Sequence, residues 1–218
     1  MMVDVIIIGA GGHAAEVNDY IICSKGRNGN PDINVIGFID DDPDSYKSYN
    51  YDAPYLGSLG NHDVSLKYFY IMAIANIKYR RPIIDDFLKK GARFISLFHQ
   101  SAYISKSARI GTGTILGPNV NIGPNVHVGC YNLINSRASL GHDTKMGSFN
   151  FISPNVSFSG NTCIGDENLF GINSATLPGV SLGHRNKISA GMIVDQNVND
   201  DSVVFYRFKE KIIAVPKK

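Results

Sequence analysis

The chain of 218 residues has few cysteines and no long apolar segment at its start. Its three cysteines, Cys23, Cys130 and Cys163, lie far apart and lack the spacing of metal ligands, and an odd number argues against a disulfide framework. The apolar segment 5–8 is too short to span a bilayer and lacks the flanks of a signal peptide. We therefore expect a protein of the reducing cytoplasm with no membrane partner.

An excess of charge is also missing. The 21 Lys and Arg residues nearly balance the 19 Asp and Glu residues, leaving a formal net charge of +2. Nucleic acids and anionic membranes attract strongly basic surfaces, so neither is expected as a partner. The hydrophobic fraction of 44% and the charged fraction of 18% are typical of a globular protein. Length alone allows one large domain or two small ones.

The first part of the chain, residues 1–97, alternates short apolar segments with helical patterns. Strands are predicted at 3–8, 35–39, 68–74 and 93–97, and helices at 13–22 and 77–90. Strands that alternate with helices favour a small parallel sheet with right-handed crossovers. We interpret this part as a Rossmann-like α/β domain.

The second part, residues 98–218, has a period of six. Seventeen positions spaced by six, from Phe98 to Val194, are apolar in sixteen cases, and glycine directly follows them nine times. This period fits neither a helix nor a hairpin sheet, but it fits a triangular β-coil with one hexad per side and 18 residues per coil. We expect the glycines where the backbone turns. A β-sandwich would instead need strict alternation and more frequent turn signals.

The tail, residues 203–218, breaks the six-residue period. The open end of a β-prism exposes unpaired strand edges, which favour aggregation. We therefore expect the tail to cap that end.

The whole pattern resembles a known family. The resemblance rests on residues 8–13, 37–41, 135–138, 142–143, 153–155 and 171–174. These segments are similar to those of the hexapeptide-repeat sugar acyltransferases related to sialic acid O-acetyltransferase. The resemblance implies a left-handed parallel β-helix assembled as a homotrimer. It also implies N-acetylation of a nucleotide-linked 4-amino-4,6-dideoxy sugar, with the nucleotide sugar held by the N-terminal domain and acetyl-CoA by the β-helix.

His142 is the candidate general base, because an imidazole can remove a proton from a sugar amine near neutral pH. Asp143 is placed to orient the ring, provided that a corner of the coil brings the two side chains together. The 18-residue coil stacks His142 between Pro124 and Gly160. Gly160 leaves room for a thioester and offers a backbone N–H to the developing oxyanion. His184 occupies an equivalent position, but the adjacent Arg185 would lower its basicity.

The resemblance also implies residues that contact acetyl-CoA: Phe151, Gly160, Ile172 and Ala190. Related enzymes often carry a second histidine where this chain has Phe151, so we expect catalysis with one base. Asn135 is expected either to position substrate across a subunit interface or to serve as a ladder or turn residue.

The N-terminal glycine turn predicts a phosphate site. Gly9-x-Gly11-x-x-Ala14 follows a strand and opens a helix, which directs backbone N–H groups and the helix dipole toward an anion. This pattern could indicate NAD, with Asp40 holding a ribose. The domain has about half the length of a full dinucleotide fold, which favours a mononucleotide-linked sugar.

The substrate residues expected in this domain follow from that interpretation. They are Gly11, Gly12 and His13 on the phosphate or sugar, Asp40 and Asp41 on the nucleoside, and Asn76 in the same crevice. No metal is expected, because residues 40–42 lack the glycine and the spaced ligands of a calcium loop.

Two other functions stay open. One is an O-acetyltransferase of sialic acid or another hydroxyl acceptor, and the other is a non-catalytic nucleotide-sugar-binding scaffold. The first expectation remains an N-acetyltransferase that supplies a precursor for a bacterial surface glycan such as the O-antigen of lipopolysaccharide.

Overall fold

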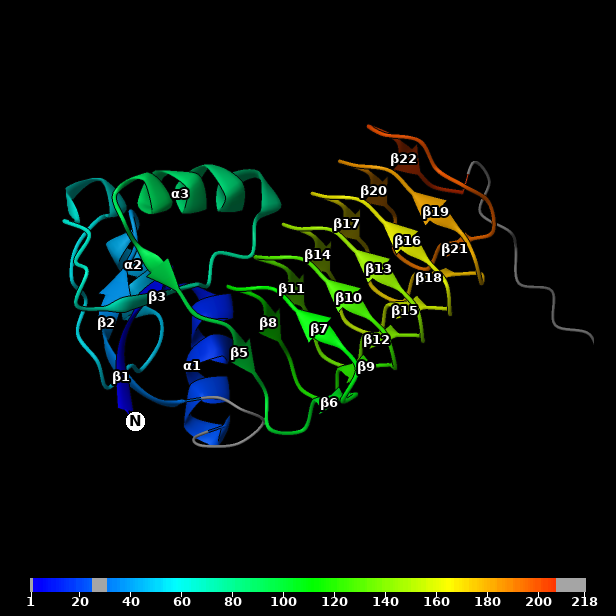
Figure 1. Ribbon diagram of the computed structural model, residues 1–218. Helices are drawn as coiled ribbons and strands as arrows, with labels where there is room; N and C mark the ends of the chain where they lie inside the picture. Colours follow the sequence, from blue (N-terminus) through cyan, green and yellow to red (C-terminus); the bar gives the residue numbers. More distant parts are fainter. Residues whose placement is uncertain (1, 25–30, 207–218) are drawn as a thin grey trace, which may run out of the picture.

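The computed structural model describes residues 2–24 and 31–206. An α/β part lies beside a three-sided stack of short strands (Figure 1). The α/β part comprises β1 (Met2–Ile8), α1 (Gly12–Ser24), β2 (Asp32–Ile39), α2 (Pro43–Lys47), the 3-10 helix η1 (Leu59–Asn61), β3 (Phe69–Met72), α3 (Ile77–Lys89) and β4 (Arg93–Phe94). Among the described residues, no helix combines the length and apolar character needed to cross a bilayer.

The predicted parallel sheet is confirmed, with strand order β2-β1-β3-β4. Its central strand β1 is covered on both faces. Val5 and Ile7 pack in the cluster that contains residues of α1, whereas Ile6 and Ile8 pack in the cluster that contains residues of α3. Burial on both faces explains why residues 5–8 of this strand are all apolar instead of alternating.

The structure corrects the expected strand over residues 93–97. β4 ends at Phe94, and Leu97 already pairs with Ile115 in the β-helix. The short helix α2 was also not predicted. The Asp42 side chain caps it by accepting a hydrogen bond from the Asp44 N–H, and Pro43 occupies its first turn.

The remaining strands form a left-handed parallel β-helix with three faces. The first face contains β5 (Leu97–Phe98), β8 (Ile115–Leu116), β11 (Leu133–Ile134), β14 (Phe151–Ile152), β17 (Leu169–Phe170), β20 (Lys187–Ile188) and β22 (Val203–Val204). The second face contains β6 (Tyr103–Ile104), β9 (Asn121–Ile122), β12 (Ser139–Leu140), β15 (Ser157–Phe158), β18 (Ala175–Thr176) and β21 (Ile193–Val194). The third face contains β7 (Arg109–Ile110), β10 (His127–Val128), β13 (Lys145–Met146), β16 (Cys163–Ile164) and β19 (Ser181–Leu182).

Stacked coils keep the predicted 18-residue register. On the third face, for example, His127 pairs with Lys145 and Val128 with Met146. The second residue of each strand enters the prism, and all of these residues except Thr176 build one apolar core. A buried amide ladder of Asn132, Asn150, Asn168 and Asn186 runs beside this core. In it, each Oδ1 accepts the backbone N–H of the residue one coil later, or of Ser202 at its end. The ladder gives each of these buried Oδ1 atoms a backbone donor, whereas the Nδ2 of Asn186 at its end has no partner among the described residues.

The hexad glycines do not make the turns, contrary to our expectation. The left-handed residue lies three places after the apolar position, as in Asp143 (φ 60°) and Asn161 (φ 60°). Gly141, directly after Leu140, has no positive φ. A Cβ at Gly141 would lie 2.7 Å from the Gly160 nitrogen. Close stacking of coils therefore explains these glycines.

The buried Arg80 joins the two parts of the chain. It lies on α3 with a relative exposure of 1%, and its Nη1 donates to the carbonyls of Met72 (3.3 Å) and Ile74 (2.9 Å). Its Nη2 donates to the carbonyl of Tyr131 in the β-helix (3.3 Å). Burial lowers the pKa of Arg80 to about 10. One guanidinium thus holds the carboxyl end of β3 against a corner of the prism.

At the far end of the prism, β22 pairs with β20 and extends the first face by one strand. The larger part of the expected cap, residues 207–218, lies outside the described residues.

We predict that Arg80→Met lowers the free energy of unfolding by about 3 kcal/mol, because three carbonyls lose a charged donor. Urea denaturation measures the change. The matched control is Arg81→Ala on the same helix, whose half-exposed side chain pairs with Glu167 and Asp85. It should cost less than about 1 kcal/mol. Equal losses in the two variants would contradict the role of Arg80.

Candidate active site

His142 and Asp143 form a pair at the corner between β12 and β13. The left-handed backbone of Asp143 turns the chain, so the two neighbouring side chains meet instead of pointing to opposite faces. His142 Nδ1 lies 2.8 Å from Asp143 Oδ2, and Asn125 Nδ2 donates to Asp143 Oδ1 at 3.1 Å. Asn125 lies one coil before Asp143, so it is the third member of the arrangement.

Asp143 is held in its ionised form. The hydrogen bond from His142 is the largest cause that lowers the pKa of this carboxyl group, and the hydrogen bond from Asn125 is the second. A carboxylate at this position accepts the Nδ1 proton of the imidazole. The lone pair of the neutral ring then lies on Nε2, the nitrogen that a general base uses.

Gly160 stacks directly over this ring, as the 18-residue period predicted. A Cβ placed on Gly160 would lie 2.6 Å from His142 Nε2 and 2.7 Å from Cε1. Any side chain at position 160 would therefore collide with the imidazole. Glycine therefore lets the imidazole pack directly against the backbone of the next coil.

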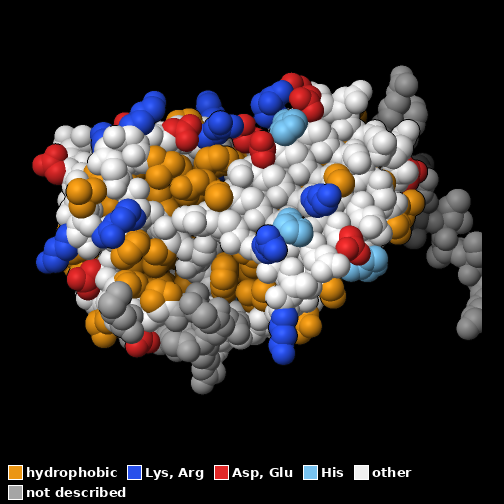
Figure 2. Space-filling model, in the orientation of Figure 1, with side chains coloured by type: hydrophobic (Ala, Val, Ile, Leu, Met, Phe, Trp, Pro, Cys, Tyr) orange, Lys and Arg blue, Asp and Glu red, His pale blue; other side chains and the backbone are white. Residues whose placement is uncertain are grey.

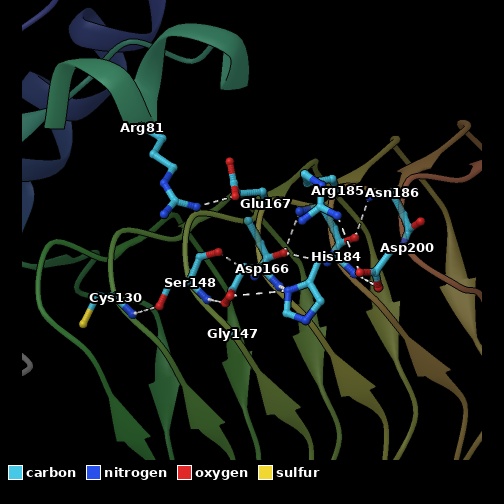
Figure 3. A network of polar contacts seen from close by, with 12 residues as sticks. Arg81, Cys130, Gly147, Ser148, Asp166, Glu167, His184, Arg185, Asn186 and Asp200 are labelled. Atoms are coloured by element: carbon cyan, nitrogen blue, oxygen red, sulfur yellow. Dashed lines mark hydrogen bonds and ion pairs between the residues drawn. The ribbon is translucent and has the colours of Figure 1, made fainter. Parts of the chain in front are cut away.

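A different corner of the prism shows what the His142 corner lacks. Between the third and first faces, the turn N–H of each coil is satisfied by a side chain of the next coil (Figure 3). Cys130 N–H donates to Ser148 Oγ (3.0 Å), Ser148 N–H to Asp166 Oδ1 (2.6 Å), Asp166 N–H to His184 Nδ1 (2.9 Å) and His184 N–H to Asp200 Oδ1 (2.9 Å). The ring of His184 is one of these side-chain acceptors, which gives this histidine a structural role.

At the His142 corner the next coils contribute Gly160 and Pro178, which carry no acceptor side chain. Within the described part of the chain, the backbone N–H groups of His142 and Gly160 have no hydrogen-bond acceptor. Two main-chain donors therefore remain available beside the ring. The Gly160 donor was expected from the sequence, and the His142 donor was not.

The other expected β-helix residues lie elsewhere on the prism. Asn135, Ile172 and Ala190 follow strands of the first face and occupy the corner between the first and second faces. Asn135 is buried, and its Nδ2 donates to the Ile152 carbonyl at 3.0 Å, whereas Ile172 is 45% exposed. The outer residue of β14, Phe151, packs on the hydrophobic cluster that contains α1.

The two corners are separated by one side of the prism, which is roughly 20 Å long when extended. One chain therefore does not bring His142 together with Ile172 and Ala190. The ring of His142 is itself 62% exposed. An enclosed site needs a second surface over this corner.

The N-terminal turn contains an unpaired buried nitrogen. Gly9 adopts a left-handed backbone (φ 107°) where the chain leaves β1, and α1 begins at Gly12. The side chain of His13 is only 10% exposed, and its Nδ1 contacts Glu16 Oε2 at 3.0 Å. Its Nε2 is buried without a partner among the described residues. A buried polar atom in the first turn of a helix marks a place where an anionic or hydroxylated ligand can bind.

The expected acidic residues are already engaged by the protein. Asp40 Oδ2 accepts the Ala10 N–H at 2.7 Å, and Asp41 Oδ1 accepts the Leu59 N–H at 2.9 Å. Asn76 caps α3 through the Lys78 N–H at 3.1 Å. In the ranges that the structure describes, no group of three or more His, Cys, Asp or Glu side chains is arranged to hold a metal.

Comparisons with known proteins agree with this architecture. Residues 4–87 match the family model of the PglD N-terminal domain. The acetyltransferase domain of PglB from Neisseria gonorrhoeae, solved with acetyl coenzyme A, is 24% identical, with a TM-score of 0.78 over 92% of this chain and 94% of that chain. A histidine-to-asparagine mutant of perosamine N-acetyltransferase from Caulobacter crescentus, solved with CoA and GDP-perosamine, is 24% identical, with a TM-score of 0.80 over 92% of both chains.

WeeI from Acinetobacter baumannii is 19% identical, with a TM-score of 0.77 over 93% of this chain and 96% of that chain. A search of curated proteins gives no match. At these identities, the solved structures show that the fold is shared.

We predict that His142→Ala raises the pKa of Asp143 toward its ordinary value, because the variant removes the largest cause of the lowering. Asn125→Ala should raise it less. In the native protein, the stabilisation from this pair is present above the unfolded-state pKa of Asp143 and is lost as pH falls through the lowered folded-state value.

Carboxyl-detected NMR titration measures these shifts. Asp201, whose pKa is lowered by Arg185, is the internal control and should not move. An unchanged Asp143 in His142→Ala would refute the coupling.

Proposed function

We propose that this protein is an acetyl-CoA-dependent N-acetyltransferase of the 4-amino group of a nucleotide-linked 4-amino-4,6-dideoxy sugar. The observation that carries the proposal is the His142–Asp143 pair, which faces the bare backbone of Gly160. The solved relatives that share the fold hold acetyl coenzyme A in one case and CoA with GDP-perosamine in another. The acetylated nucleotide sugar would be made in the cytoplasm and would be a precursor of a bacterial surface glycan.

In the proposed reaction, His142 Nε2 removes a proton from the sugar amine as its nitrogen attacks the thioester carbonyl. Asp143 holds the Nδ1 proton and stabilises the imidazolium that forms. The new C–N bond produces a tetrahedral oxyanion, to which the backbone N–H groups of Gly160 and His142 can donate. Collapse of this intermediate breaks the C–S bond, and the imidazolium returns the proton to the departing thiolate of CoA.

This proposal needs one base and no acyl-enzyme. Phe151 stands where related enzymes often have a second histidine, so this position contributes packing and no proton transfer. Cys163 is the exposed outward residue of β16 on the third face, beside Lys145 in the strand register, and the proposal gives it no role.

We further propose that the active unit is a homotrimer. The expected CoA-contacting residues Ile172 and Ala190 lie on a different corner from His142 and Gly160. A neighbouring copy can place its corner of Ile172 and Ala190 over the exposed ring of His142. The acceptor would be held by Gly11, Gly12 and His13, where the buried Nε2 lacks a partner. The other expected substrate residues would contribute to binding indirectly, through the local structure that their hydrogen bonds support. These residues are Asp40, Asp41, Asn76 and Asn135.

The activity is tested by incubating the protein with acetyl-CoA and panels of nucleotide-linked amino sugars and hydroxy sugars, and following thiol release. We expect turnover with an amino acceptor, and His142→Asn should reduce kcat by about 10² to 10⁴ while the trimer and ligand binding persist. Activity on sialic acid alone would support the O-acetyltransferase alternative. Full retention of activity in His142→Asn would contradict the proposed base.

We predict that Gly160→Ala lowers kcat by about 100-fold, because the added methyl displaces the imidazole from its working position. Steady-state kinetics give the change, and the folded state is checked by thermal unfolding. The matched control is Gly60→Ala, since a Cβ at Gly60 meets no atom within 4 Å. Wild-type kcat in Gly160→Ala would show that the contact between coils does not position the ring.

A further inference from the structure

Four of the 11 tyrosines lie within ten residues of the N-terminal domain, and we name them the tyrosine cluster. They are Tyr46, Tyr49, Tyr51 and Tyr55, in the segment that follows β2. The ring centroids of Tyr46 and Tyr51 lie 5.3 Å apart, and those of Tyr49 and Tyr51 lie 6.1 Å apart. Side chains of the hydrophobic class, which includes tyrosine, gather over the α/β part of the face shown in Figure 2. Contacts between the rings hold the hydroxyl groups of the cluster in place.

The tyrosine cluster adjoins the glycine turn before α1. The Tyr51 hydroxyl donates to the Ala10 carbonyl at 2.8 Å and lies 3.2 Å from the Gly11 carbonyl. A Cβ placed on Gly12 would lie 2.8 Å from the hydroxyl oxygen of Tyr49, and it would meet no residue other than Tyr49 within 4 Å. Gly12 has no positive φ, so the position of Tyr49 explains why a side chain is missing there. The Tyr49 hydroxyl therefore lies beside the first turn of α1.

The same turn has free main-chain donors. Within the described ranges, the backbone N–H groups of Gly11, Gly12 and His13 have no acceptor. A second, independent observation is the buried His13 Nε2, which also lacks a partner there. Free N–H groups at the start of a helix bind phosphate and other anions. The turn is therefore where the proposed function places a phosphate of the acceptor.

Tyr49 is the member of the cluster whose hydroxyl proton is not already used. A hydroxyl group has one proton to donate, and the other three members donate theirs to main-chain carbonyl groups. Ser45 Oγ, which also approaches the turn, donates to Asp42 Oδ2 at 2.8 Å. The Tyr49 hydroxyl has no partner among the described residues, and its side chain is 43% exposed. Its proton is therefore free for a ligand.

We propose that Tyr49 is an acceptor-binding residue whose hydroxyl donates to the phosphate on the first turn of α1, an inference that rests on the proposed function. The hydroxyl oxygen lies within roughly 4 Å of the Gly12 Cα, because a Cα–Cβ bond adds about 1.5 Å to the distance from the Cβ. An anion bound to the free N–H groups of the turn lies within reach of this hydroxyl. The phenol thus adds a side-chain donor to the main-chain donors without adding a charge.

The test is equilibrium binding by calorimetry, with UDP, GDP, dTDP and CoA as separate probes. Tyr49→Phe keeps the ring in the cluster and removes only the hydroxyl. It should bind the preferred nucleoside diphosphate about 10-fold more weakly, the loss expected for one hydrogen bond to a charged group. Its affinity for CoA should stay within about twofold, because the proposed function places CoA on the β-helix.

The matched control is Tyr103→Phe, which removes the hydroxyl of a 61% exposed tyrosine on β6 of the prism. It should leave the affinity for the nucleoside diphosphate unchanged. Thermal unfolding of both variants confirms that they are folded.

The contact between Tyr49 and Gly12 has a test that needs no ligand. Gly12→Ala should lower the melting temperature of the native protein, because the added methyl collides with the phenol. In the Tyr49→Ala background, the same substitution should cost little, because the methyl meets no other residue within 4 Å. An equal loss in both backgrounds would show that Tyr49 does not cover Gly12, and the inference would fail.

Three binding results would also overturn the inference. They are unchanged affinity for the nucleoside diphosphate in Tyr49→Phe, an equal loss of CoA affinity, and no binding of any nucleoside diphosphate by the native protein. Weaker diphosphate binding by Tyr49→Phe, in a protein that acetylates no amino sugar, would support the role of Tyr49 and refute the proposed function. Acetylation of an amino sugar by the native protein, with full diphosphate affinity in Tyr49→Phe, would do the reverse.

Discussion

Hydrogen bonding between successive coils is the constraint on which the candidate site depends. Asp143 N–H donates to the Pro124 carbonyl, and Asn161 N–H donates to the His142 carbonyl, each at 2.9 Å. These bonds fix residue 160 over residue 142 with little freedom. The contact between the imidazole and the bare Gly160 backbone therefore follows from the main chain. The side chains only have to be of the right type at positions that the backbone has already set.

The same constraint explains why adjacent corners of one prism differ in role. At one corner, the polar ladder from Cys130 to Asp200 uses side chains to satisfy the turn N–H groups, and the result is structural. At the His142 corner, Gly160 and Pro178 leave those groups without side-chain acceptors. The same backbone geometry thus gives a closed corner in one place and a corner with free donors in another. Arg80 then holds the N-terminal domain in a defined position beside the early coils.

Much of this could be predicted from the sequence, because a repeat of six residues dictates both the faces of the prism and the stacking partners. The position of Gly160 over His142 followed from counting 18 residues. The same count would have found Asn125 beneath Asp143, although the type of contact depends on side-chain rotamers. The prediction that the hexad glycines make the turns was wrong, since the sequence does not show which turn residue takes a positive φ. The function of Arg80 and the engagement of Asp40 were also beyond the sequence, because both depend on tertiary packing.

The central claim is that the acyl carrier binds beside the His142 ring and the Gly160 backbone that packs against it. A crystal structure of the protein with CoA measures this directly. The account predicts the CoA sulfur within about 3 to 4 Å of His142 Nε2, beside the Gly160 amide and covered by a neighbouring copy of the chain. CoA bound elsewhere on the prism, with the His142 ring open to solvent in the assembled protein, would contradict it.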